Sequence, residues 1–395
     1  MRTVVFVAPF ALPTTRRVIE AVARLADVRV IAMLQEHPQE PLSCEVWICP
    51  AVLDDASLTG CLDRLVRQVG LPHRLLGILE ALQEPLARQR ARLGIEGMRP
   101  ETANRFRDKD RMKACLREAG VGVAASCRVD AHTTADEILE RVGLPLVLKP
   151  LAGAGAVATV RVDDAAGLRT QLAALPRPLI AETFLSGAEH SMEVLVRGGE
   201  VLFHSVTRYL PSALEVSNNP HLQWVVHLPR DTSAFADAVP QVTRAVLALG
   251  MDTGIAHAEW FRMPDGRVLI GEIGARPPGA GFLDLHSHAH EADWFDAWAR
   301  LVVDGTFAGP WPRRWSVAGV YLRGPGRGRV AAVEGLERAQ RDMGIHVVEA
   351  RLPQIGQPRR DGYEGEGFVV IRHRDDDTVR EAALSLIRTV RVHYA

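Results

Sequence analysis

The sequence predicts an α/β protein with more than one domain. The chain begins with a strand–helix–strand pattern, in which apolar runs over 3–8 and 28–34 flank an amphipathic helix over 14–26. Further along, short β-rich runs alternate with helical patterns. The tight-turn dipeptide Asp265-Gly266 lies between two runs rich in apolar and β-branched residues. With 395 residues, the chain is long enough for two or three domains, each with its own core.

The composition is that of an ordinary globular protein, with 47% apolar residues, 24% charged residues and a net charge of −1. This balance gives no reason to expect nucleic acid or an acidic membrane surface as a general partner. Five cysteines occur without a CxxC pair, which fits reduced thiols and a cytoplasmic location better than a disulfide framework or a zinc site. They are Cys44, Cys49, Cys61, Cys115 and Cys127.

No segment approaches the roughly 18 apolar residues that a membrane span requires. The apolar run over 3–13 could be taken for a short signal peptide. It is brief, however, and an amphipathic helix follows it, so a buried first strand is the better interpretation.

The first unit continues with an apolar run over 44–52, predicted as a further strand, and a stretch over 62–95 that is helical in period. No GxGxxG follows the first strand, so the dinucleotide-binding fingerprint is absent. These features indicate a Rossmann-like unit without that cofactor.

A second unit begins near Pro100. Asp108 is a suitable N-cap for a helix over 109–119 that ends at Gly120. The later elements are expected to be strands over 144–149 and 157–162 around a small-residue loop at 150–156, strands over 179–184 and 192–196, a helix over 234–249, the hairpin around Asp265-Gly266, a helix over 291–303 with Trp294 and Trp298 on its core face, a Pro/Trp/Arg linker at 309–314, and a final helix over 377–390.

The hairpin carries the most informative pair of residues. Folding it about Asp265-Gly266 places Glu259 directly opposite Glu272, on the same face of the sheet. Like charges in this position are destabilising, and the flanking residues are too apolar for a solvated hairpin, so a bound cation is the expected compensation. Paired carboxylates combined with substrate phosphates are the usual way to hold Mg²⁺. Arg276, just after the second strand, could meet an anion held by that metal.

Lysine is rare in this chain, because only three of its 47 basic residues are lysines. A chain that uses arginine almost everywhere is expected to keep lysine where a compact ammonium group is needed. Lys109 begins a predicted helix, and Lys149 ends a predicted strand just before the small-residue loop. From the residues alone, an ordinary surface charge stays open for both.

The order of these features resembles the ATP-grasp superfamily: Lys109, Lys149, the run 181–189, the Glu259/Glu272 pair and then Arg276. Within it, the whole chain is similar to the carboxylate–amine (amino-acid or dipeptide) ligases. The resemblance implies an α+β ATP-grasp fold in three parts. They are a Rossmann-like pre-ATP-grasp domain at 1–100, a two-lobed ATP-grasp domain at 101–308 that binds the nucleotide and performs catalysis, and a C-terminal α+β subdomain at 309–395.

For nucleotide binding, the resemblance implies that Lys109 and Lys149 hold the ATP phosphates, a role for which a mobile ammonium is well suited. The Gly153-Ala-Gly155 loop corresponds to the flap that closes over the phosphates with its backbone N–H groups. The remaining ATP-binding positions are the hinge between the lobes, which meets adenine through its backbone and apolar side chains, and an acidic residue for the ribose hydroxyls. These positions are Glu182, Phe184 and Leu185 for the hinge, and Glu189 for the ribose.

For catalysis, the resemblance implies that Glu259 and Glu272 bind Mg²⁺, with Mn²⁺ as an alternative ion. Arg276 corresponds to the catalytic arginine that stabilises the acyl-phosphate and the tetrahedral intermediate. One departure concerns the metal, because Gly274 stands where many family members have an asparagine ligand. A second metal ion would then be held less completely.

Histidines leave two questions open. The run His286-Ser-His-Ala-His290 could suggest a zinc site, although a pocket wall or ordinary polar surface is the favoured reading. His257 shares the strand face of Glu259, and either a place in the substrate pocket or ordinary packing fits it equally well. No GxSxG elbow supports Ser/His/Asp hydrolysis.

The expected function is that of an ATP-dependent carboxylate–amine ligase that forms an amide or peptide bond through an acyl-phosphate and releases ADP and phosphate. The expected partners are ATP, Mg²⁺ and small-molecule carboxylate and amine substrates, with amino acids favoured. Relatives of this kind are often homodimers, which makes a homodimer one expected assembly. Two alternatives stay open: a biotin-carboxylase-like enzyme that activates bicarbonate, and a nucleotide-binding protein without turnover.

Overall fold

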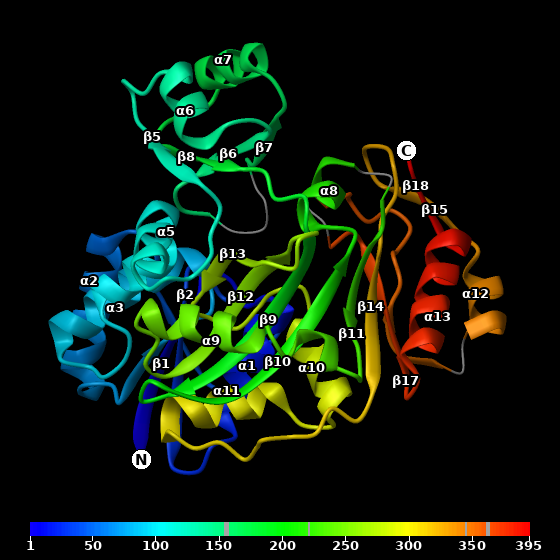
Figure 1. Ribbon diagram of the computed structural model, residues 1–395. Helices are drawn as coiled ribbons and strands as arrows, with labels where there is room; N and C mark the ends of the chain where they lie inside the picture. The colour runs from blue at the N-terminus through cyan, green and yellow to red at the C-terminus, as the bar shows by residue number, and fades with distance from the viewer. Residues whose placement is uncertain (154–157, 220–221, 344–345, 361–363) are drawn as a thin grey trace.

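The computed structural model describes residues 1–153, 158–219, 222–343, 346–360 and 364–395. Figure 1 shows a lower body, a small lobe standing above it, and the C-terminal elements along one side. Sheets of four, four, eight and two strands organise these described residues.

The N-terminal part forms a four-stranded sheet of order β3-β2-β1-β4 in which neighbouring strands run parallel. Parallel neighbours require crossover connections. The helix α1 connects β1 to β2 and α2 leads from β3 to β4, whereas β2 and β3 are joined by a segment without a helix. The predicted strand–helix–strand beginning is confirmed. The elements are β1 (Arg2–Val7), α1 (Pro13–Ala23), β2 (Val28–Leu34), β3 (Glu45–Ile48), α2 (Asp55–Val69), β4 (Arg74–Leu76), the 3₁₀ turn η1 (Glu80–Leu82) and α3 (Gln83–Leu93).

One expectation for this part is wrong, because the stretch over 62–95 is not helical throughout. β4 interrupts it and pairs with β1. A strand of three residues is too short to show alternation in the sequence, yet Leu75 at its centre is fully buried. Long-range pairing, which the local pattern does not report, decides the structure here.

The small lobe is an antiparallel sheet of order β5-β8-β6-β7 with two helices packed on it (Figure 1). Asp108 caps the helix that leads into it by accepting hydrogen bonds from the N–H groups of Asp110 and Arg111, as expected. The elements are α4 (Pro100–Arg107), α5 (Lys109–Glu118), β5 (Ser126–Val129), α6 (Ala135–Val142), β6 (Leu146–Pro150), β7 (Val160–Val162), α7 (Ala165–Ala174) and β8 (Leu179–Thr183).

The body is built around an eight-stranded sheet of order β13-β12-β9-β10-β11-β14-β17-β16. Its strands come from both sides of residue 309, so the last part of the chain continues the sheet that the middle part begins. The elements are β9 (Ala188–Arg197), β10 (Glu200–Leu210), α8 (Ala213–Asn218), β11 (Trp224–Leu228), the 3₁₀ turn η2 (Ser233–Phe235), α9 (Val239–Ala248), β12 (Gly254–Arg262), β13 (Val268–Gly274), α10 (Phe282–His290), α11 (Trp294–Asp304), β14 (Ser316–Leu322), β15 (Val330–Glu334), α12 (Leu336–Met343), β16 (Val347–Arg351), β17 (Gly367–His373), α13 (Asp376–Thr389) and β18 (Arg391–Tyr394).

The two faces of this sheet are covered differently. Met192, Ala258 and Trp260 point into a core shared with α5 and α9. The opposite face is covered by α10 and α11, and Trp294 and Trp298 lie in the core between α11 and the N-terminal sheet, as predicted. The predicted hairpin residues Glu259 and Glu272 alternate with the first set, so the strand period of two turns them away from that core.

The hairpin confirms the predicted pairing of Glu259 with Glu272, although its turn is offset by one residue. Next to the turn, Trp260 pairs with Ile270, and a bulge at Gly271 then restores the expected register at the carboxylates. A Cβ atom at position 271 would lie 2.9 Å from the ring of Phe261, so only glycine fits this close approach. The predicted register is therefore correct at the carboxylates because a bulge compensates for the longer turn.

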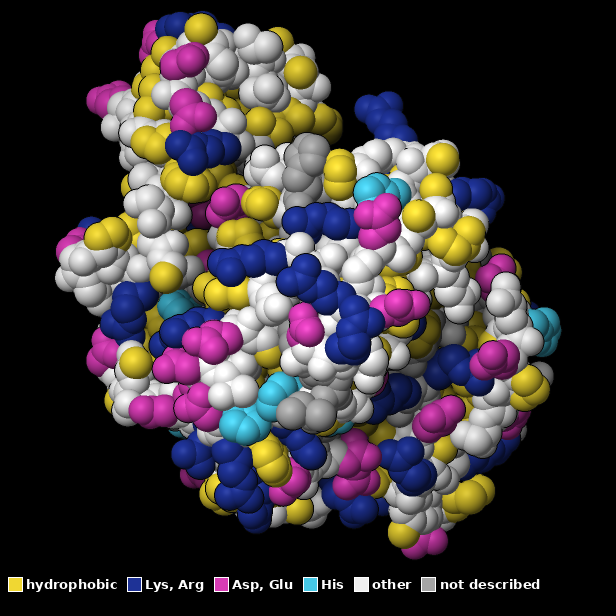
Figure 2. Space-filling model, turned by 90° about the vertical axis from the view of Figure 1, so that its right-hand side faces the viewer, with side chains coloured by type: hydrophobic (Ala, Val, Ile, Leu, Met, Phe, Trp, Pro, Cys, Tyr) yellow, Lys and Arg dark blue, Asp and Glu magenta, His cyan; other side chains and the backbone are white. Residues whose placement is uncertain are grey.

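The C-terminal side of the molecule shows no single-sign patch. Figure 2 shows basic and acidic side chains interspersed over this face, in keeping with the near-zero net charge, and a hollow at the base of the small lobe. Among the helices of the described residues, none has the length and hydropathy needed to cross a bilayer.

Candidate active site

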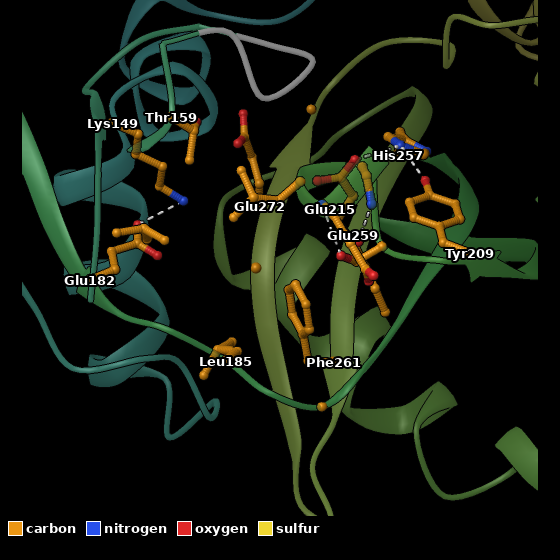
Figure 3. A pocket seen from close by; sticks show the side chains of 18 of the residues that line it. Lys149, Thr159, Glu182, Leu185, Tyr209, Glu215, His257, Glu259, Phe261 and Glu272 are labelled. Atoms are coloured by element: carbon orange, nitrogen blue, oxygen red, sulfur yellow. Dashed lines mark hydrogen bonds and ion pairs between the residues drawn. The ribbon is translucent and has the colours of Figure 1, made fainter. Parts of the chain in front are cut away.

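A cavity of about 570 Å³ lies between the small lobe and the edge of the eight-stranded sheet that β12 and β13 form. Both lobes contribute, because β6, β8 and the segment after β8 form one wall and β12 and β13 form the other (Figure 3). Every predicted site residue lines it: Lys109, Lys149, Glu182, Phe184, Leu185, Glu189, Glu259, Glu272 and Arg276. The predicted flap at 153–155 lies largely outside the described residues, and Gly153 lines the cavity.

The two hairpin carboxylates form the centre of the site. Glu259 and Glu272 are cross-strand neighbours, and the Nζ atom of Lys109 lies 2.9 Å from Oε1 of Glu272. Within the described residues, no cluster of three or more His, Cys, Asp or Glu side chains is arranged to hold a metal by itself. Two carboxylates completed by substrate phosphates and water nevertheless suit Mg²⁺, which keeps several non-protein ligands. The donor set therefore fits this ion.

All three lysines of the chain meet at this cavity or directly behind it. Lys149 and Lys113 contact the same carboxylate, with their Nζ atoms 3.0 and 3.1 Å from the two oxygens of Glu182. Burial acts to raise the pKa of Glu182, but the two ammonium groups outweigh it and lower the pKa to about 2. Figure 3 shows Lys149 and Glu182 side by side on the small-lobe side of the cavity, joined by this ion pair. The side chain of Glu182 thus orients lysines, while its expected role concerned the backbone at the hinge.

Lys113 is a residue that the sequence reasoning missed. It is fully buried and donates hydrogen bonds to the carbonyl oxygens of Ile270 and Gly271, so it ties α5 to the bulge of the catalytic hairpin. Its rarity as one of three lysines was a usable signal. The chain also contains a Met-Lys pair, Met112-Lys113, but a buried lysine is not available to carry biotin.

The expected adenine end of the cavity is apolar. Leu185 and Phe261 lie at the same end of the pocket in Figure 3. The Phe184 ring is stacked by the guanidinium of Arg161 at 4.2 Å, and its N–H donates to the carbonyl of Pro145. This packing holds the segment between the lobes in a fixed conformation.

Glu189 lies on the large sheet, and its Oε2 accepts a hydrogen bond from the N–H of Ala213 at the start of α8. Burial, followed by repulsion from Glu259, raises the pKa of Glu189 to about 8. The carboxyl group is thereby placed to respond to a ligand that adds hydrogen-bond donors or positive charge nearby.

Behind the two hairpin carboxylates lies a buried histidine–glutamate network that the sequence reasoning did not assemble. Glu193 is fully buried on β9, with Nδ1 of His257 at 2.6 Å and Nε2 of His286 at 2.5 Å. The other nitrogen of His257 is 3.5 Å from Glu259 and 3.4 Å from the hydroxyl of Tyr209. Figure 3 shows His257 and Tyr209 together at the end of the cavity opposite Lys149.

Electrostatics fixes the charges in this network. Burial acts to raise the pKa of Glu193, but His286 and His257 lower it to about 2. For His257, burial acts to lower the pKa, while hydrogen bonds to Glu193 and Glu259 raise it to about 9. Burial would raise the pKa of Glu259, yet His257 reverses the shift and the pKa is lowered. The Glu259 carboxylate is thus held in its ionised form by a positively charged imidazole.

The zinc alternative for His286, His288 and His290 finds no support in the described residues. His286 and His290 both contact Ser205 Oγ, at 2.8 and 3.0 Å, whereas His288 turns toward Glu349 at 3.1 Å. His286 and His290 are buried and do not line the cavity, so they form a buried polar wall behind it rather than the expected pocket wall or polar surface. His257 belongs to the same wall and lines the cavity itself.

Arg276 is anchored by a residue from the N-terminal part of the chain. Its Nε donates to Oε2 of Glu80 at 2.6 Å, and Arg107 approaches the other oxygen of Glu80 at 3.3 Å. A Cβ atom at Gly274 would lie 3.2 Å from Oε2 of Glu80, so this carboxylate occupies space next to position 274. Glu80 has no local signal in the sequence, because its place depends on how η1 meets the hairpin.

The end of the cavity away from Lys149 is aromatic. Tyr209, Trp224 and Phe282 line it and pack with ring centroids 5.1 to 6.0 Å apart. Charge therefore concentrates around the carboxylates and lysines, and apolar surface at the far end.

Comparison with known proteins identifies the class. Residues 114–291 match the family profile described as the ATP-grasp domain. This middle part of the chain is therefore similar to ATP-grasp domains. The chain is 32% identical over 220 residues to a D-alanine–D-alanine ligase of Sodalis glossinidius, covering 50% of this chain and 57% of that protein. It is 27% identical over 201 residues to an L-arginine-specific L-amino acid ligase of Bacillus subtilis, covering 49% and 48%. The chain thus spans about half the length of these curated relatives.

Solved structures extend the similarity to the whole fold. The L-amino acid ligase from Bacillus licheniformis superposes with a TM-score of 0.79 at 19% identity, covering 100% of this chain and 99% of that one. The N5-carboxyaminoimidazole ribonucleotide synthetase from Thermotoga maritima gives 0.75 at 18% identity, with 100% of both chains covered. At these identities the comparison shows the α+β ATP-grasp fold, which the sequence predicted. The sequence relatives lie in the carboxylate–amine ligase branch of the superfamily.

Proposed function

We propose that this protein is an ATP-dependent carboxylate–amine ligase that forms an amide or peptide bond through an acyl-phosphate and releases ADP and phosphate. The supporting observation is that two lysines, two facing carboxylates and one arginine meet in a single cavity. They are Lys109, Lys149, Glu259, Glu272 and Arg276. The similarity to named amino-acid ligases supports amino acids as the substrate class.

In the proposed reaction, the substrate carboxylate attacks the terminal phosphorus of ATP, and the bond to ADP breaks. The amine then attacks the carbonyl carbon of the acyl-phosphate, the C–O bond to phosphate breaks, and the nitrogen loses its proton to solvent. Such phosphoryl and acyl transfers depend mainly on positioning and electrostatics, which explains a site without a nucleophilic side chain.

Each charged residue has a proposed task. Lys109 and Lys149 bind the nucleotide phosphates, and Glu272 and Glu182 hold the two ammonium groups in place beforehand. Glu259 and Glu272 would hold Mg²⁺ or Mn²⁺, which supplies positive charge against the phosphate oxygens. Arg276, positioned by Glu80, stabilises negative charge that develops on the acyl and phosphate oxygens.

The nucleotide base and ribose have proposed contacts as well. Leu185 and Phe184 offer apolar surface to adenine, the backbone beside Glu182 meets its polar edge, and Glu189 accepts hydrogen bonds from the ribose hydroxyls. His257 orients Glu259, because Glu193 fixes one imidazole nitrogen and leaves the other directed at the metal ligand.

We also propose the organisation of the chain into a pre-ATP-grasp domain at 1–100, an ATP-grasp domain at 101–308 and a C-terminal subdomain at 309–395. A cytoplasmic location and a homodimer belong to the same proposal, with small molecules as the only partners needed. Reduced cysteines in the described structure are in keeping with the first, since all five are free.

The direct test is ADP release with Mg·ATP across a matrix of amino acids and small carboxylates, offered singly and in pairs. The proposal expects ADP only with particular pairs and a product whose mass equals their sum minus water. ADP release that depends on bicarbonate would instead support the carboxylase alternative. Tight Mg·ATP binding with no ADP under any combination would support a non-catalytic nucleotide-binding protein.

A further inference from the structure

A second cavity, of about 390 Å³, lies on the other side of Arg276. Arg276 lines both cavities, so this residue lies between them. The walls of the second cavity come from the N-terminal sheet, the β9–β10 turn, the segment before β12 and α11. The charged residues that line it are Arg74, Arg90, Glu96, Arg197, Asp252 and Arg276.

Arg90 is the least compensated charge in this cavity. It is 6% exposed, and burial lowers its pKa to about 10. Its protein contacts are hydrogen bonds to two backbone carbonyls, Leu75 at 2.8 Å and Met98 at 3.4 Å. No carboxylate of the described residues lies within ion-pair distance of it. A buried charge without a counter-ion is costly, and an anion in the adjoining cavity would remove that cost.

Other guanidinium groups line the same space. Arg197, the exposed last residue of β9, lines the cavity and donates to the carbonyl of Gly305 at 3.2 Å. Arg74 donates to the carbonyl of Val302 at 3.0 Å and meets Glu96 at 3.0 Å. With Arg90 and Arg276, four guanidinium groups line this cavity. Arg276 is paired with Glu80 and Arg74 with Glu96. Arg90 and Arg197 have no carboxylate partner among the described residues, and Asp252 is the remaining carboxylate of the lining. The cavity therefore carries an excess of positive charge.

We propose that the second cavity binds a second anionic group of the substrate whose reacting end lies at Arg276, and that this group is a carboxylate. Guanidinium groups present parallel N–H donors that match a carboxylate or a phosphate, and the four arginines place such donors around one space. This inference rests on the proposed ligase function and specifies its substrate class: a small molecule with a carboxylate beyond its reacting end, such as an acidic amino acid.

Binding can be measured without turnover. The full-length protein is saturated with Mg²⁺ and a non-hydrolysable ATP analogue, so that Lys109 and Lys149 are occupied and do not compete for anions. Succinate, glutarate, inorganic phosphate and the neutral diamide of succinate are then titrated by calorimetry. We expect saturable binding of the dicarboxylates and no binding of the diamide. Preferential binding of phosphate would show that the second anionic group of the substrate is a phosphate and not a carboxylate. The absence of saturable binding of any anion would overturn the inference.

Variants locate the site. Arg90 also ties β4 to the segment at Met98, so its substitution could disturb folding, and Arg197 is the better target because it is exposed. Arg197→Gln is expected to weaken dicarboxylate binding about tenfold, as for loss of one charge-assisted hydrogen bond. Arg197→Lys should retain part of the affinity. Arg67→Gln, on α2 and lining neither cavity, is the matched control and should bind like the wild type. Equal affinity in Arg197→Gln and wild type would contradict the inference.

The same variants separate this inference from the proposed function. If the ligase assay yields a product, Arg197→Gln should raise KM for an acidic substrate about tenfold and leave kcat and neutral substrates unchanged. If Arg197→Gln does not change turnover and no dicarboxylate binds, the second anion site would be wrong and the proposed ligase function would stand. If the wild type binds dicarboxylates, Arg197→Gln does not, and no turnover is found under any condition, the anion site would stand and the proposed ligase function would be wrong.

Discussion

At the scale of single residues, the site depends on pairs of charges that hold one another in place. Lys109 forms an ion pair with Glu272, Lys149 with Glu182, and Arg276 with Glu80. A nucleotide and its metal would exchange with these internal partners, so the charged groups are oriented before the ligand arrives. Substitutions at this scale should therefore affect turnover far more than folding.

Glu272→Gln tests the metal assignment. The amide keeps the shape of the side chain but loses the charge that Mg²⁺ and Lys109 require, so kcat should fall at least about a hundredfold. The midpoint of urea unfolding should change little, because Glu272 is only half-buried. Normal turnover in this variant would make the metal assignment wrong. Asp265→Asn, at the exposed turn of the same hairpin, serves as the control.

Glu193→Gln tests the buried network. One amide cannot accept strong hydrogen bonds from both His257 and His286, and the positive imidazole loses its counter-ion. We expect a loss of about 1–3 kcal/mol in the free energy of unfolding and weaker Mg²⁺ affinity, because Glu259 loses its orientation. The measurement is a Mg²⁺ titration of nucleotide-analogue binding. Glu200→Gln, exposed on β10 and outside the network, should leave Mg²⁺ affinity unchanged, and an unchanged affinity in Glu193→Gln would exclude the orienting role.

At the scale of elements, the catalytic hairpin depends on a single bulge. Gly271 adds one residue to β13, and this residue brings Glu272 opposite Glu259 despite the offset turn. Lys113 donates to the carbonyl of Gly271, so α5 supports the bulge from behind. The hairpin is thus specified by a turn, a glycine and a buried lysine acting together.

Gly271→Ala should disturb this arrangement, because its methyl group would lie 2.9 Å from the Phe261 ring and 3.3 Å from the carbonyl of Glu259. Crowding of this kind costs about 1–3 kcal/mol, and kcat should fall with it. Gly60→Ala is the matched control, since its methyl group would meet nothing within 4 Å on α2. That variant should gain about 0.5–1 kcal/mol. Equal effects of the two substitutions, measured by urea unfolding, would argue against the bulge.

Elements also show how far the sequence could predict this protein. The Glu259–Glu272 pairing was predicted because an Asp-Gly turn and a period of two are local signals. The strand at Arg74–Leu76 was not identified because three residues show no alternation, and the helix at Ala165–Ala174 has no clear apolar face. The helix at Ala135–Val142 was missed although its capping box, formed by Thr134 and Glu137, is a signal in the sequence. The roles of Glu80 and Glu193 were not predicted, for another reason. Their partners are distant in the chain, and only the folded sheets bring them together.

At the scale of the whole molecule, buried neutral histidines make stability depend on pH. Burial lowers the pKa of His190 and His227 to about 4 and that of His290 to about 3, below the usual value of 6.5. The unfolded chain therefore binds protons first, so the stability contributed by these groups is present above pH 6.5 and is lost as the pH falls toward 4. Glu189, with its pKa raised to about 8, acts in the opposite direction but does not offset three histidines.

We expect the free energy of unfolding to fall by at least about 1 kcal/mol per pH unit below pH ~6. Urea unfolding at pH 7.5 and pH 5.0 measures the difference. His290→Gln should reduce this pH dependence, whereas His132→Gln, at an exposed position, should leave it as in the wild type. Identical unfolding curves at the two pH values would show that the buried histidines are not neutral in the folded protein.

The gathering of all three lysines around one cavity has a practical consequence for handling this protein. Apart from the N-terminus, no primary amine lies elsewhere on the chain, and Lys149 is less buried than Lys109 or Lys113. An amine-reactive dye or cross-linker would consequently label the cavity proposed to bind the nucleotide rather than the general surface. Nucleotide should protect against it, and attachment to a support through amines would block the very cavity under study.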